Sequence, residues 1–109
     1  MFKIVDEPTF SHEVTARVPV DGGFREETFT ATFRVIDPEE ADEFDLTTTA
    51  GSTAFLRRTV VKLDDVGDAQ SKLLEWSDEV RDAALRLPWA RSALARTYFA
   101  AISGAKSGN

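Results

Sequence analysis

The first third of the chain alternates between apolar and polar side chains. From residue 10 to residue 20 the apolar positions are even-numbered, and from residue 28 to residue 35 they are odd-numbered. A period of two is that of a strand with one buried face, so the pattern predicts two half-buried β-strands. The sequence Asp21-Gly22-Gly23 lies between them. Because glycine supplies the positive φ that tight turns require, we expect a β-hairpin.

The register of this hairpin follows from parity. The two apolar faces coincide only if paired residue numbers sum to an odd value, which requires a loop of two or four residues. A two-residue loop at positions 21 and 22 would place Val14 opposite Phe29, whereas a loop at positions 22 and 23 would place Ala16 opposite Phe29. The sequence alone does not choose between these two registers.

Helical signals begin after residue 36. Asp37, Pro38 and Glu40 have the spacing of an N-cap, a proline in the first turn and a capping box, which predicts a short acidic helix ending near Leu46. A second helix starting near Ser52 would place its apolar residues on one arc as far as position 63. The β-branched residues at 59–61 favour instead a strand over residues 59–63, and both assignments stay open.

Two more helices are expected near the C-terminus. Ser77 can cap the first, and Pro88 can start the second, which should run to about Ser103. In the first of these helices, four apolar residues recur at the spacing of a buried stripe. They are Val80, Ala83, Ala84 and Leu87.

Apolar residues spread around nearly the whole circumference of the last helix. The polar strip that remains is narrow and consists mainly of Ser92, Arg96 and Ser103. Such a helix is either central to the fold or buried by a partner, and both interpretations stay open.

These elements predict an α+β fold. We expect an N-terminal antiparallel β-hairpin, with residues 2–5 as a candidate third short strand, packed against a C-terminal bundle of three to four helices. The chain has 109 residues and is 42% hydrophobic, which fits one core. The expected domain covers residues 1–103, and residues 104–109 are expected to be a disordered tail.

Composition narrows the function classes. The formal net charge of −6 opposes a phosphate backbone, so we expect no nucleic acid partner. The absence of cysteine excludes disulfides, thiolate zinc sites and thiol nucleophiles, and it fits a reducing cytoplasm. The first residues lack the pattern of an export signal, and no apolar run approaches the roughly 18 residues of a membrane span. We therefore expect no membrane partner.

Candidate chemistry is sparse. The single histidine, His12, sits on the apolar face of the first strand, and we interpret it as structural. The acidic run at 37–45 lacks the glycine and the ligand order of an EF-hand loop. Gly51-Ser52 is not followed by the lysine that a phosphate-binding loop requires. We expect no catalytic residue, no cofactor and no metal ion, and so a protein that is not an enzyme.

Three stretches carry a family resemblance. They are residues 17–29 (RVPVDGGFREETF), residues 43–49 (EFDLTTT), and residues 87–99, which begin LPWAR and end YF. In this order they resemble tail assembly chaperones of long-tailed phages with non-contractile, siphovirus-type tails. The resemblance implies a protein of the host cytoplasm that coats the tape measure protein, recruits tail tube subunits and is absent from the mature virion. It also implies a longer, frameshifted form and no catalytic residues.

Protein binding, including self-association, is assigned to the last helix from its apolar circumference and its flanking cations. The candidate residues are Trp89, Arg91, Arg96, Tyr98, Phe99 and Ile102. An alternative is an acidic inhibitor or DNA mimic, in which the acidic run at 37–45 occupies a basic groove on a nuclease or repressor. A third alternative is a tail completion protein that remains in the virion.

Overall fold

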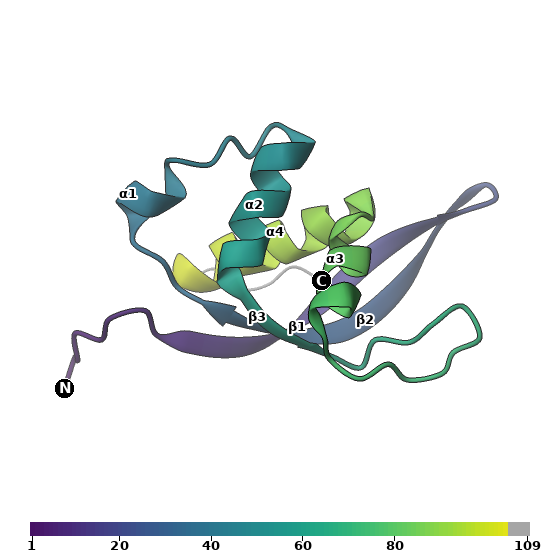
Figure 1. The fold of residues 1–109 in the computed structure, drawn as a ribbon, viewed down its shortest axis with the longest axis horizontal. Helices are drawn as coiled ribbons and strands as arrows, with labels where there is room; N and C mark the ends of the chain where they lie inside the picture. The colour runs from purple at the N-terminus through teal and green to yellow at the C-terminus, as the bar shows by residue number, and fades with distance from the viewer. Residues whose placement is uncertain (105–109) are drawn as a thin grey trace.

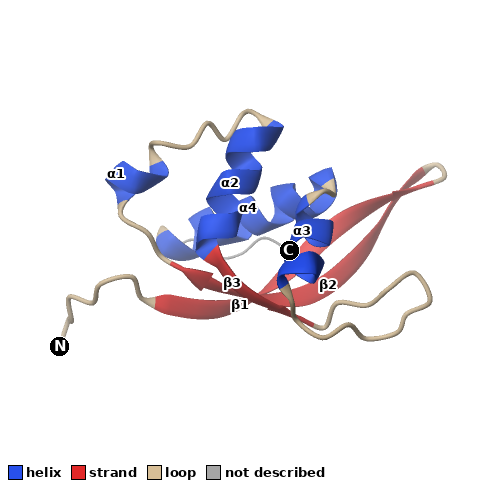
Figure 2. Cartoon of the chain, viewed as in Figure 1, coloured by secondary structure: helices blue, strands red, loops and turns tan. Residues whose placement is uncertain are grey.

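The computed structural model describes residues 1–104, so most of the tail predicted at 104–109 lies outside the described residues. Three strands form one antiparallel sheet in the order β1-β2-β3, and the helices lie on one of its faces (Figures 1 and 2). This arrangement confirms the predicted α+β fold. The elements are β1 Thr9–Val20, β2 Gly23–Arg34, α1 Pro38–Ala41, α2 Thr49–Thr59, β3 Val60–Asp64, α3 Asp78–Leu85 and α4 Pro88–Ile102.

The hairpin adopts the register with the loop at positions 21 and 22. Val14 pairs with Phe29, and Phe10 pairs with Phe33. Gly22 has a φ of 78°, the left-handed conformation that favours glycine. Because the paired residue numbers sum to an odd value, the apolar residues of both strands share the face that the helices cover. The tip of the hairpin extends beyond the helices (Figure 1).

The third strand comes from the segment whose assignment was open. Helix α2 ends at Thr59, and Val60–Asp64 continues as β3 along the free edge of β2, with an irregularity where Phe33 pairs with Val60. The predicted strand at residues 2–5 is therefore wrong, since these residues form no strand. Glu7, with a positive φ of 46°, and Pro8 separate them from β1.

The acidic helix is shorter than predicted. Asp37 caps it as expected, since its Oδ1 accepts a hydrogen bond from the Glu39 N–H at 2.9 Å, but α1 ends at Ala41 rather than near Leu46. Further carboxylates at 42, 43 and 45 would face the negative end of the helix dipole. The Asp45 carboxylate instead accepts from the Thr47 N–H and hydroxyl, which lowers the pKa of Asp45.

An aromatic cluster forms the centre of the core between the sheet and helices α2 and α4. The Tyr98 ring contacts those of Phe33 and Phe55, with centroids 5.7 and 5.2 Å away. Its hydroxyl accepts a hydrogen bond from the buried Ile36 N–H at 3.2 Å. His12 lies half-buried in β1, and its Nδ1 donates to the Glu13 carbonyl at 2.6 Å.

An ion cluster anchors the base of the N-terminal arm, residues 1–6. Arg58 of α2 donates to both Glu7 and Glu40, with the closest N–O distances 2.7 Å in each pair. The Glu40 carboxylate is thereby engaged with α2 rather than with the start of its own helix. Hydrogen bonds from Arg58 are the main cause of a lowered pKa at Glu7, and the charges of Arg58 and Arg34 add to it.

This cluster predicts a pH-dependent stability. Because the pKa of Glu7 is lowered on folding, its contribution is present above the unfolded value of about 4.5 and is lost as pH falls through the folded value. Arg58→Met should therefore lower the melting temperature at pH 7, and the difference from wild type should shrink as the pH falls below about 4.5. Arg25→Met, which removes a more exposed pair with Glu27, should change the melting temperature little. An Arg58→Met deficit that is constant with pH would contradict this assignment.

Candidate protein-binding surfaces

The six residues assigned to protein binding do not form one surface. Tyr98 is only 1% exposed and belongs to the core. Arg91 donates to the carbonyl of Leu85 at 2.8 Å and so caps the end of α3. Arg96 is exposed, and it donates to the Thr15 carbonyl on the edge strand β1 at 3.3 Å.

The other three predicted residues remain partly or largely open to solvent, at two separate places. Phe99 and Ile102 are 37% and 46% exposed near the C-terminal end of α4. Trp89 is half-buried at the opposite end of that helix, where it lines a groove. Helix α4 is thus central to the fold and also partly uncovered, and burial of the uncovered part by a partner stays a prediction.

Phe99 and Ile102 belong to a surface that we call the α4 stripe: Ala95, Phe99 and Ile102 of α4, together with Leu46. The three helical residues are spaced by four and three, so they lie along one side of the helix. Leu46 is 40% exposed and lines the same shallow depression as Ala95. The stripe is an apolar row of the kind that an amphipathic helix can cover.

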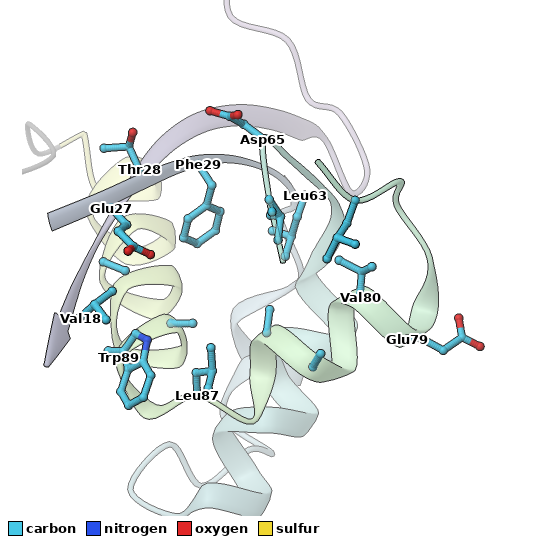
Figure 3. A pocket seen from close by; sticks show the side chains of 17 residues that line it. Val18, Glu27, Thr28, Phe29, Leu63, Asp65, Glu79, Val80, Leu87 and Trp89 are labelled. Carbon is cyan, nitrogen blue, oxygen red and sulfur yellow. The ribbon is translucent and has the colours of Figure 1, made fainter. Parts of the chain in front are cut away.

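A second surface lies between the hairpin, α3 and the start of α4. This α3 groove has a volume of about 370 Å³ and is open to solvent. Figure 3 shows Phe29, Leu87 and Trp89 directed into it. Its apolar lining also includes Val18, Val80, Ala83 and Ala84.

The groove changes the interpretation of α3. Its predicted buried stripe, Val80, Ala83, Ala84 and Leu87, lines the groove: Ala84 also packs against the core and Val80 is half-buried, but Ala83 is exposed and Leu87 is 40% exposed. The side chain that α3 buries is Leu85. The burial prediction is therefore wrong for Ala83 and Leu87, because the hairpin stands away from this side of α3. An apolar stripe without cover in the folded chain indicates a binding surface.

The charged residues that line the α3 groove are all acidic. They are Glu27, Asp65 and Glu79. Asp65 and Glu79 lie at the edge of the groove in Figure 3. Glu27 pairs with Arg25 at 2.8 Å, and both side chains are more than half exposed. This pair therefore offsets only part of the negative charge of the three acidic lining residues, which we call the acidic rim. The connection from β3 to α3, residues 65–77, adds Asp68 and Glu75 against a single Lys72.

The N-terminal arm is apolar and uncovered. Met1, Phe2 and Ile4 are more than 90% exposed, and Val5 is 59% exposed. The charged residues of the arm are Lys3 and, at its base, Asp6. Figure 1 shows the arm leaving the end of the sheet opposite the hairpin tip and running away from α3. Four large apolar side chains are therefore in water in the isolated chain.

Sequence reasoning missed the α3 groove and the exposure of the N-terminal arm. Two signals were present: the apolar stripe of α3, which was assigned to the core, and Phe2 and Ile4, which were assigned to a strand. Neither signal revealed exposure, because exposure depends on how the hairpin and helices meet.

Within residues 1–104, no group of three histidine, aspartate or glutamate side chains is arranged to hold a metal ion. No helix in that range has both the length and the apolar character needed to cross a bilayer. Comparison with protein-family models, with curated proteins and with solved structures gives no match for this chain.

Proposed function

We propose that this protein is a tail assembly chaperone of a long-tailed phage with a non-contractile tail. In this role it binds the tape measure protein and recruits tail tube subunits in the host cytoplasm, and it is absent from the mature virion. It performs no catalysis. The α4 stripe is the observation that carries the proposal, because it presents apolar side chains at helical spacing on an acidic, charge-rich domain.

The client chemistry follows from the stripe. A tape measure protein is expected to be long and helical, and an isolated helix of this kind exposes an apolar face that aggregates unless it is covered. Phe99 and Ile102 can pack against such a face, while Leu46 extends the contact beyond α4. The net charge of −6 keeps the resulting coat soluble. The three sequence stretches that resemble the family add independent support.

The test is binding to the tape measure protein encoded in the same genome. Ile102→Asp, alone and combined with Phe99→Ser, should weaken binding at least tenfold, since each change places a polar group in an apolar contact. Circular dichroism should show that both variants remain folded, because both positions are more than a third exposed. Mass spectrometry of purified virions should not detect the protein.

The matched control neutralises the acidic segment. Asp42→Asn with Glu43→Gln should leave tape measure binding unchanged, since both residues are exposed and lie outside the stripe. Asp45 is left intact because its carboxylate holds the Thr47 turn. If the wild-type protein does not bind the tape measure protein but binds a nuclease or repressor through these carboxylates, the acidic-inhibitor alternative replaces the proposal. Detection in purified virions would instead favour a tail completion protein.

A further inference from the structure

We infer that the N-terminal arm of one copy docks into the α3 groove of a second copy, so that the protein associates with itself by exchanging arms. Two uncovered apolar surfaces occur on the same chain, and Lys3 among the apolar residues of the arm is opposite in charge to the acidic residues that line the groove. The inference is independent of the proposed client, because it concerns contacts between identical chains.

Charge complementarity selects the arm as the occupant. The charged residues that line the groove are Glu27, Asp65 and Glu79, and all are acidic. The arm carries Lys3 between Phe2 and Ile4. In an extended segment, alternate side chains point to opposite sides, so Phe2 and Ile4 can face the apolar floor while Lys3 faces the acidic rim.

Size agrees with this assignment. A volume of about 370 Å³ lies near the lower end of the range of ligand pockets, about 300 to 1,000 Å³. Such a groove has room for a few large side chains rather than for a folded domain. Val18 and Phe29 on one wall and Trp89 on another provide apolar contacts for them.

The geometry directs the arm to another copy. Arg58 holds Glu7 at 2.7 Å, and the Pro8 carbonyl accepts from the Val35 N–H at 2.8 Å, so only residues 1–6 are free to move. Six extended residues span about 20 Å, whereas Val18, at the far end of the groove, lies ten strand residues beyond Pro8, about 33 Å away. The arm can approach the near end of its own groove beside Phe29 but cannot run along it to Val18, so an arm that fills the whole groove comes from another copy.

Sedimentation velocity over a range of concentrations tests the inference on the full chain. The wild-type protein should self-associate. The arm variant, Phe2→Asp with Ile4→Asp, should associate at least tenfold more weakly, and so should the groove variant, Ala83→Arg. Ala83 is exposed on α3 and arginine is a good helix former, so this variant should fold normally.

Mixing the two variants gives the sharper result. The arm variant retains an intact groove and the groove variant retains an intact arm, so together they should form a 1:1 complex at concentrations where each alone is monomeric. The Lys3→Glu variant alone should associate more weakly than wild type. Mixing it with a second chain that carries Glu79→Lys should restore association. A wild-type protein that stays monomeric up to about 1 mM would overturn the inference. So would a mixture of the two variants that stays monomeric, or an arm variant that associates like wild type.

Discussion

Replacing Gly51 with alanine is expected to destabilise the domain by about 3 kcal/mol or more, which is at or beyond the upper end of overpacking costs. A Cβ at this position would lie 1.9 Å from the carbonyl oxygen of Asp45 and 2.9 Å from the Thr48 hydroxyl. The first contact is with backbone, which cannot rotate away. The turn at residues 45–48 would have to move, and with it the Thr48 cap that accepts from the Gly51 N–H at 2.9 Å.

The sign of this effect opposes helix propensity. Gly51 lies in the first turn of α2, and exchanging a helical glycine for alanine ordinarily gains up to about 1 kcal/mol. Thermal melting should nevertheless show a decrease of roughly 10 °C or more for Gly51→Ala. Gly23→Ala is the matched control, since nothing lies within 4 Å of its added Cβ, and it should melt close to wild type. Equal or higher stability of Gly51→Ala would show that the turn yields easily.

The parts of the fold that depend on residues close together in the sequence could be predicted from the sequence. Parity and the glycine at position 22 restricted the hairpin to two registers, one of which forms. The caps at Asp37 and Ser77 and the start of α4 at Pro88 are as expected, because each uses a local hydrogen bond or a fixed φ. The extent of α1 was wrong because the Asp45 side chain stabilises a separate turn.

The features that depend on tertiary packing could not be predicted. The end of α2 is set by the free edge of β2, which pairs with Val60–Asp64 and so turns an ambiguous β-branched segment into a strand. The six residues assigned to protein binding lie at separate places because α4 contacts β1, α2 and α3 at once, and these contacts bury Tyr98. The α3 stripe shows the converse case: its periodicity is that of a core helix, and its exposure follows from the position of the hairpin.

Replacing Tyr98 with alanine should cost about 3 to 5 kcal/mol, the range for large aromatic to alanine changes in a core. The ring is 1% exposed and packs edge-on against Phe33 and Phe55. Its removal therefore leaves a cavity between the sheet and helices α2 and α4. It also leaves the Ile36 N–H without the hydroxyl that accepts from it. A loss of this size would remove a large part of the free energy of unfolding of a typical domain, which is about 5 to 15 kcal/mol.

Two matched variants separate these contributions in chemical denaturation. Tyr98→Phe keeps the ring but removes the acceptor of the buried Ile36 N–H, and should cost about 1 to 3 kcal/mol. Phe99→Ala, one position further along α4, removes a ring that is 37% exposed and should cost about 1 to 2 kcal/mol. If Phe99→Ala were as damaging as Tyr98→Ala, Phe99 would be a core residue, and the α4 stripe would lose the side chain on which client binding depends.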